Sequence, residues 1–143
     1  MDTASIIAQV RAARASSIPV EWRLAESQID RAARPIDVVK RAGLLSEAEL
    51  ALTEQDVTEL LKKIHAGELT SQAVTEAFLK RAALAHQVAN CLTEFFPDEA
   101  RAAAKEVDEV FQRTGKPVGP LHGLPIAIKV LCFEPDAKTV CWI

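Results

Sequence analysis

Gly115 to Val130, with the sequence GKPVGPLHGLPIAIKV, is the stretch around which the rest of the chain is expected to fold. Two glycines and two prolines come directly before its apolar end: Gly119, Pro120, Gly123 and Pro125. Glycine reaches backbone angles that are closed to other residues, and proline fixes φ. The mixture therefore predicts a shaped turn rather than a loose loop.

The residues after this turn predict a β-strand, because apolar side chains alternate along it. Ile126, Ile128 and Val130 would share one face, and Ala127 and Lys129 the other. Lys129 is therefore expected to lie beside a small residue, with room in front of its amine.

A second segment with strand composition lies upstream, at 90–96 with the sequence NCLTEFF. Pro97 then opens a predicted helix that ends at Gly115. The order strand, helix, strand is that of a βαβ crossover with two parallel strands. The expected fold class is therefore α/β and helix-rich, with N-terminal helices followed by one βαβ unit of what would be a larger mixed sheet.

Three parts of the chain are distinguished by composition. Residues 1–34 are expected to form an N-terminal helix, with Ile6, Ile7 and Val10 on one face, and an extended arm anchored by Trp22. Residues 35–130 are expected to form a partial domain of helices plus the βαβ unit. Residues 131–143 form an atypical C-terminal tail.

Hydroxyl residues predict three helix starts in the middle part. Ser46 and Thr53 are each followed three residues later by an acid, which is the capping-box pattern. Thr70 lies between apolar residues that form a hydrophobic staple, and Gly67 before it supplies a helix stop. These signals predict helices that begin after each hydroxyl.

Composition limits the classes of partner. The chain has 143 residues and a net charge of −3, so it carries no basic surface for nucleic acid and no polybasic membrane patch. No apolar run approaches the ~20 residues that span a bilayer. The opening stretch contains arginines rather than the apolar core of a signal peptide. A cytoplasmic protein is expected, with no nucleic-acid or membrane partner.

The cysteines and histidines do not predict a metal site or a cofactor site. Cys91, Cys132 and Cys141 show no CxxC spacing, and the three histidines are scattered along the sequence. His122, inside the turn, is expected to make a loop-stabilising hydrogen bond rather than to act in catalysis.

The run from Gly119 to Lys129 resembles the amidase signature family, in particular its acetamidase-like branch. Members carry a Gly-Pro-Leu-His-Gly-hydrophobic-Pro run that leads into a strand ending in Lys-Asp. Ile18 to Leu24 is similar to an Ile-Pro-x-Glu-Trp-Arg-Leu arm of the same branch. The resemblance thus covers roughly Ile18 to Lys129, but this chain has Val130 where the family has aspartate.

The resemblance implies hydrolysis of the carbon–nitrogen bond of small amides by a Ser, cis-Ser, Lys triad, without a metal or organic cofactor. It places Lys129 at the position of the catalytic base. A free lysine, with a pKa near 10.4, is a cation at neutral pH, but burial in an apolar strand can lower the pKa by several units. The neutral amine that results can accept a proton from serine.

In the family, the serine-bearing segment lies downstream of the lysine strand, and no residue of this chain corresponds to it. The expected function is that of an N-terminal amidase fragment, truncated just after the catalytic-lysine position. It is expected to be inactive alone because the groups of a triad act as a unit. A shifted reading frame, a retained intron or a real isoform stay open as origins of the tail.

Two other interpretations stay open. The chain is either a non-catalytic helical interaction module derived from an amidase, or an independent enzyme that pairs Lys129 with another group. For every interpretation, the unpaired edge of the expected strand makes self-association a possible interaction of this chain.

Overall fold

The computed structural model describes residues 2–128, and all regular structure in that part of the chain is helical. Two 3₁₀ turns, Val20–Trp22 and Glu26–Gln28, lie between the first two α-helices. In chain order the α-helices are α1 (Thr3–Ser16), α2 (Pro35–Arg41), α3 (Glu47–Thr53), α4 (Val57–His65), α5 (Ser71–Ala89) and α6 (Pro97–Thr114).

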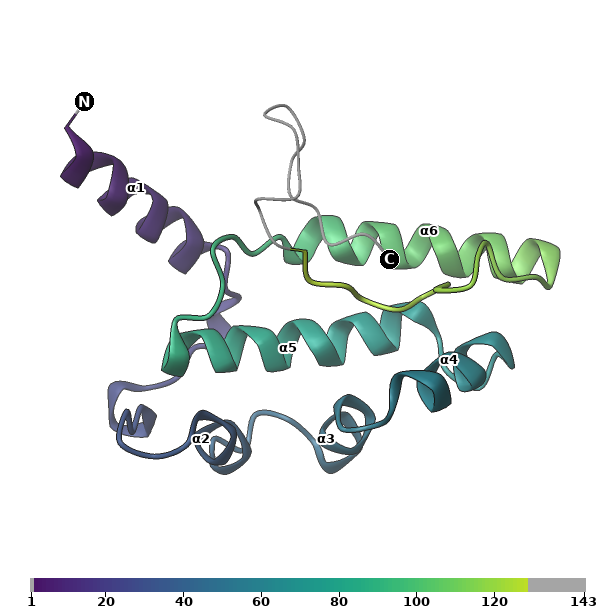
Figure 1. The fold of residues 1–143 in the computed structure, drawn as a ribbon, viewed down its shortest axis with the longest axis horizontal. Helices are drawn as coiled ribbons and strands as arrows, with labels where there is room; N and C mark the ends of the chain where they lie inside the picture. The colour runs from purple at the N-terminus through teal and green to yellow at the C-terminus, as the bar shows by residue number, and fades with distance from the viewer. Residues whose placement is uncertain (1, 129–143) are drawn as a thin grey trace.

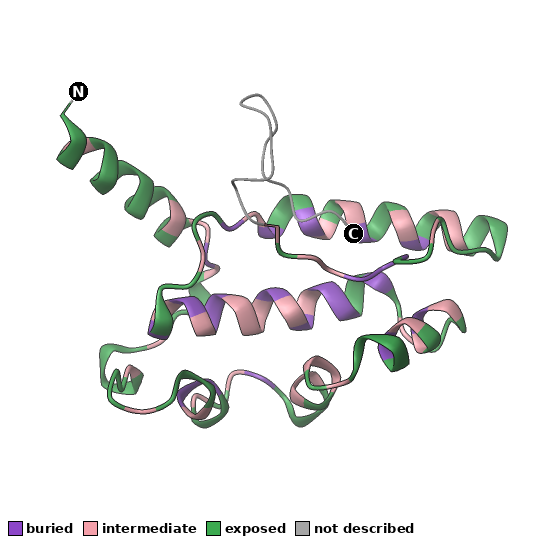
Figure 2. Ribbon diagram, in the orientation of Figure 1, coloured by how far each residue is buried: buried purple, intermediate pink, exposed green. Residues whose placement is uncertain are grey.

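Helix α5 is the centre of the fold (Figure 1). It contacts α6 along one side and α2 and α3 along the opposite side. Figure 2 shows buried or half-buried residues over almost its whole length. A helix that is covered on two opposite sides has no single apolar stripe. Its buried residues are Ser71, Val74, Thr75, Ala77, Leu79, Ala83, Leu84, His86 and Val88.

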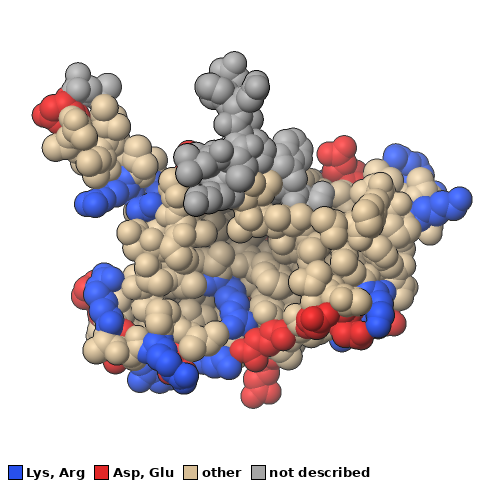
Figure 3. All heavy atoms as spheres, viewed as in Figure 1, with Lys and Arg blue, Asp and Glu red and all other residues tan. Residues whose placement is uncertain are grey.

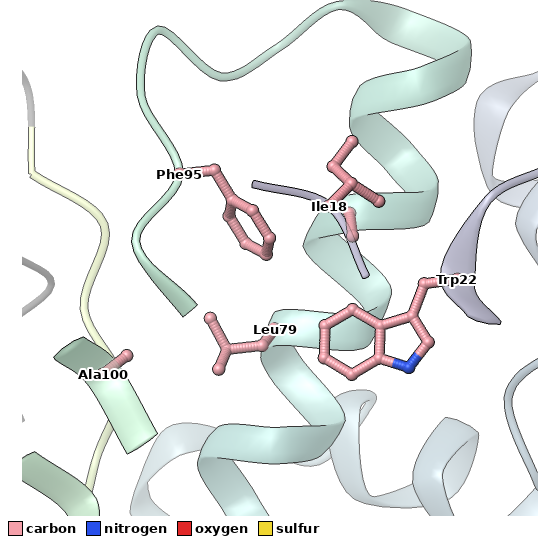
Figure 4. Close-up of a cluster of buried hydrophobic side chains, with 6 residues drawn as sticks. Ile18, Trp22, Leu79, Phe95 and Ala100 are labelled. Atoms are coloured by element: carbon pink, nitrogen blue, oxygen red, sulfur yellow. The ribbon is translucent and has the colours of Figure 1, made fainter. Parts of the chain in front are cut away.

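Three clusters of buried side chains make up the core, and each includes residues of α5. The first joins α5 to the N-terminal arm and α6, and Figure 4 shows its members converging from these segments. Its buried members are Ile18, Trp22, Leu79, Ala83, Phe95 and Ala100. The second contains Leu60, Ile64, Val74 and Leu124, and the third Val39, Leu45 and Leu84.

Charged side chains of α5 form ion pairs with the neighbouring helices α6 and α3. Glu76 accepts a hydrogen bond from Arg101 Nε of α6 at 2.8 Å. The same guanidinium lies 5.0 Å from the ring centroid of Trp22. Lys80 Nζ lies 3.1 Å from a carboxylate oxygen of Glu49 in α3. These pairs connect α5 to α6 and to α3.

The predicted βαβ unit is wrong: residues 2–128 contain no strand and no sheet. The 90–96 segment connects α5 to α6, and side chains form hydrogen bonds with its backbone groups. Arg14 Nη1 donates to Leu92 O at 2.6 Å and to Thr93 O at 3.4 Å. Leu92 N donates to His86 Nδ1 at 3.0 Å. A strand needs such groups for a neighbouring strand, so this segment cannot pair along these positions.

The predicted helix starts are confirmed at Ser46 and Thr70 but wrong at Thr53. Ser46 and Glu49 form a reciprocal capping box, and Thr70 accepts from the amide of the third helical residue. Thr53 is instead the last residue of α3, where its hydroxyl donates to Glu49 O at 2.9 Å. The Asp56 carboxylate caps α4, because it accepts from Thr58 N at 2.8 Å.

The N-terminal helix is confirmed, but its apolar face is not covered by the described residues. Helix α1 extends away from the other helices (Figures 1 and 2), and none of its residues is buried. Ile6, Ile7 and Val10 are 47%, 46% and 48% exposed.

Acidic and basic side chains are interspersed on the face shown in Figure 3. No helix within residues 2–128 combines the length and the apolarity that crossing a membrane requires.

Leu84 allows a test of the central position of α5, because its side chain is fully buried. We expect Leu84→Ala to lower the free energy of unfolding by about 2–5 kcal/mol, since it removes packed methyl groups and leaves a cavity. Leu121→Ala, at a position 47% exposed, should change it by less than about 0.5 kcal/mol. Urea denaturation measures both, and equal losses would contradict the assigned core.

Candidate functional site

Residues 117–124 form the turn that the glycine and proline pattern predicts, and we call this segment the His122 turn. His122 N donates to Gly119 O at 3.2 Å, and Leu124 N donates to Leu121 O at 3.1 Å. Gly123 has φ = 75°, a left-handed conformation that glycine adopts without strain. The prediction of a shaped turn is confirmed.

The His122 turn docks where α4, α5 and α6 meet. Leu124 packs in the core with Leu60 and Ile64 of α4 and Val74 of α5. Three consecutive residues of the turn, 122–124, are buried. The segment after the turn therefore starts from a fixed point on the helices, and Pro125, Ile126 and Ile128 within it are half-buried.

The His122 ring is 2% exposed and holds the turn together from inside. Its Nδ1 accepts a hydrogen bond from Val118 N at 3.2 Å. The ring centroid lies 5.2 Å from that of Phe111 and 6.1 Å from that of His65. The expected loop-stabilising role of His122 is confirmed. Since an accepting Nδ1 carries no proton, the neutral ring has its proton on Nε2.

The environment of His122 favours its neutral form. Burial lowers its pKa, and the nearby His65 lowers it further, while the Asp108 carboxylate acts in the opposite direction. Protonation of Nδ1 would remove the acceptor that Val118 uses. The turn is therefore built for a neutral histidine.

The contact between Gly123 and α5 is too close for a side chain. A Cβ at this position would overlap Ser71 Oγ, and it would lie 2.9 Å from Ile64 Cγ2 and 3.1 Å from Ser71 Cβ. Ser71 has no exposed surface. The backbone of the turn therefore lies directly on the first residue of α5.

A buried carboxylate secures that end of α5. Asp108 of α6 accepts hydrogen bonds from Ser71 N at 2.7 Å, from Gln72 N at 3.0 Å and from Gln72 Nε2 at 3.2 Å. Burial acts to raise the pKa of Asp108, but the hydrogen bonds from Gln72 and Ser71 outweigh it, so the pKa lies below its ordinary value. The carboxylate is thus an anion at the positive end of the helix dipole.

The proposed catalytic residue, Lys129, lies outside the described residues, and so do Cys132 and Cys141. Immediately before it, Ile126 and Ile128 are half-buried and Ala127 is exposed, but residues 126–128 have no regular secondary structure, so the strand predicted to begin there is not formed over these residues. Cys91 is a free, exposed thiol. Within residues 2–128 no three His, Cys, Asp or Glu side chains are grouped as a metal site requires.

Sequence reasoning missed Asp108 and Ser71. The available signal for Asp108 was its spacing, because Ala100, Ala104 and Asp108 recur every four residues and all three are buried on one face of α6. A buried acid on that face of α6 needs a hydrogen-bond donor from the helix that it faces. Nothing in the sequence identified the first turn of α5 as that donor.

A groove of about 580 Å³ lies away from the His122 turn, between the end of α1 and residues 93–99. Arg14 lines it but is already bonded to Leu92 O and Asn90 Oδ1. Among the described residues, those of the His122 turn are thus held in a fixed position. The groove contains no complete set of reacting groups.

Comparisons with known proteins give this geometry a context. Residues 73–141 match the family model described as Amidase. The chain is 46% identical to an acetamidase of Emericella nidulans over 142 residues, which cover 96% of this chain and 26% of that protein. It is also 46% identical to an acetamidase of Aspergillus oryzae over 124 residues, covering 87% of this chain and 22% of the relative.

A solved structure of a fatty acid amide hydrolase matches with a TM-score of 0.76 and 40% sequence identity. That match covers 83% of this chain and 22% of the solved one. The chain therefore spans about a quarter of the length of the relatives that it matches.

The Gly123 contact predicts an unequal effect of the same substitution at two glycines. Gly115 has φ = 66° and no atom within 4 Å of an added Cβ, so Gly115→Ala should cost only the left-handed backbone strain, about 1–2 kcal/mol. Gly123→Ala should cost about 1–3 kcal/mol more, because the methyl group overlaps Ser71 and Ile64. Urea denaturation compares the variants, and equal costs would contradict the close contact.

The neutral form of His122 predicts a loss of stability in acid. Its folded pKa is below the ordinary 6.5, so its contribution is complete above about pH 6.5 and is lost as the pH falls toward the folded pKa. The slope is at most about 1.4 kcal/mol per pH unit per histidine. His86, whose pKa burial also lowers, contributes with the same sign.

Urea midpoints at pH 7.5 and 5.5 measure this effect. His122→Asn is the control, since its amide oxygen can replace Nδ1 as an acceptor but does not titrate. We expect the variant to lose less stability than the wild type between the two pH values. Identical losses would show that His122 is not held neutral.

Proposed function

The chain belongs to the amidase signature family, and we propose that it supplies the general base, Lys129, for hydrolysis of the carbon–nitrogen bond of small amides. The observation that carries the proposal is the buried His122 turn, which ends five residues before this lysine in the segment that matches the family. The acetamidase names of two relatives support small amides as the substrate class.

In the proposed reaction, the neutral amine of Lys129 accepts a proton that leaves the nucleophilic serine by way of a second, cis-configured serine. The serine oxygen forms a bond with the amide carbon, and the carbon–nitrogen bond breaks as the leaving nitrogen takes the proton that Lys129 accepted, which restores the neutral amine. Water then releases the acyl group from the serine. No metal or organic cofactor takes part in this scheme.

The serines of this scheme belong to the part of the family's length that this chain does not span. The 143-residue chain alone is therefore proposed to be inactive, because a base without its nucleophile cannot transfer an acyl group. A positive test of Lys129 needs the rest of an amidase.

A chimera supplies that test. The matched segment of the Emericella nidulans acetamidase is replaced by this chain, and ammonia release from acetamide is measured. We expect the chimera to be active and Lys129→Ala to lower kcat/KM by at least about 100-fold, the usual contribution of a general base. Lys129→Arg should be equally impaired, since guanidinium cannot be deprotonated in proteins.

The matched control is Lys116→Ala, at an exposed lysine of the same stretch, which should leave the rate unchanged. The isolated chain, assayed alongside, should release no ammonia. An active Lys129→Ala chimera would exclude the proposed base, and turnover by the isolated chain would show that it needs no further segment.

A further inference from the structure

The exposed apolar face of α1 continues into the groove beside residues 93–99. Val10, Ala13 and Arg14 line that groove. Ile6 and Ile7 lie four and three residues before Val10, and helical residues at this spacing share one face. The same face of α1 therefore forms one wall of the groove and extends beyond it.

This face is held in place although the described residues leave it uncovered. Arg14 donates to Leu92 O at 2.6 Å and to Asn90 Oδ1 at 3.1 Å, which ties the end of α1 to the connection between α5 and α6. From that point α1 extends away from the other helices (Figure 1), and no residue of it is buried. Single exposed apolar residues are ordinary, but a continuous row that leads into a groove is typical of an interaction surface.

The two walls of the groove carry opposite charge. Helix α1 contains two arginines and, apart from the capping Asp2 at its tip, no acid. Residues 93–99 contain three acids and no basic residue. Between residues 2 and 128, no ion pair joins the exposed Arg11, Glu94 or Glu99 to another side chain. A patch with a basic side and an acidic side is complementary to a second copy of itself.

A two-fold dimer requires such a patch, because each residue pair occurs twice, once in each direction. We propose that α1 is a dimerisation helix that packs antiparallel on α1 of a second copy of this chain. The two isoleucines lie as far before Val10 as the groove-lining Ala13 and Arg14 lie after it. When the two helices cross at Val10, the isoleucines of each copy therefore enter the groove of the other.

The charges fit the same arrangement. Arg11 follows Ile7 by four residues, so it lies on the flank of the apolar face. This flank faces the acidic wall of the other copy, where Arg11 meets Glu94 and Glu99 at the exposed rim. An unrelated partner would need only one of the two walls, whereas a second copy uses both. This self-association needs no strand edge, and it does not rest on the proposed role of Lys129.

Sedimentation equilibrium of the 143-residue chain is the first test. The mass should rise from 15.6 kDa to twice that value as the concentration increases, and no further, because a two-fold interface closes on itself. A monomer at every concentration up to about 500 μM overturns the proposal. Growth beyond the dimer overturns it as well.

Two exposed valines give a matched comparison. Val10 is 48% exposed, and Val57, on α4 and outside the groove, is 52% exposed. Val10→Ala removes two methyl groups from each copy at the crossing point, so the dissociation constant should rise at least about 10-fold. Val57→Ala should change it less than about 2-fold. Alanine favours the helix at both sites, and equal effects of the two substitutions overturn the proposal.

Charge reversal tests the antiparallel arrangement. Arg11→Glu should raise the dissociation constant at least about 10-fold, because it places like charges opposite each other. Glu94→Arg combined with Glu99→Arg should do the same. All three reversals together should restore the constant to within about 3-fold of the wild type, which a folding defect cannot do. Weakening without restoration overturns the proposal, and so does association that none of these substitutions changes.

Discussion

The central place of α5, which is buried or half-buried over almost its whole length, is the constraint on which the other elements depend. A helix can leave its first amides to solvent where they are exposed, but Ser71, the first residue of α5, has no exposed surface and lies between α6 and the His122 turn. Its amide needs a protein acceptor, because an unpaired donor in the interior costs about 1–3 kcal/mol. Asp108 provides that acceptor. The need to satisfy a buried helix end thus fixes α6 relative to α5, and the turn relative to both.

Three different interactions meet at the His122 turn, and none of them adjusts easily. The bonds to Asp108 depend on charge, the contact of Gly123 with Ser71 depends on the absence of a side chain, and the site of His122 depends on a neutral ring. Each fails in a different way when it is changed. Together they fix the His122 turn relative to α4, α5 and α6.

The missing strands show how the same sequence pattern serves two structures. The 90–96 segment has strand composition, yet its carbonyls bind the guanidinium of Arg14, more than seventy residues earlier in the chain. Composition indicates which partners a segment can bind, whereas the groups that lie beside it in the folded chain determine which partner it does bind. Here side chains bind backbone groups of the connection between α5 and α6, so those groups are not available to hydrogen-bond with a neighbouring strand.

The sequence by itself determined the features that depend on residues close together in the chain. The capping box at Ser46 and Glu49, the stop at Gly67 and the turn around Gly123 were all predictable, because each hydrogen bond or φ value involves neighbours within a few residues. The amidase resemblance was readable from the same local run. Only the tertiary structure decided that Asp108 caps α5. The position of a carboxylate among the alanines of α6 does not indicate which helix end it will contact, and Ser71 and Gln72 are 37 and 36 residues away in the sequence. The absence of a sheet in residues 2–128 was decided in the same way, because strand pairing is a contact between distant segments and no local pattern contains it.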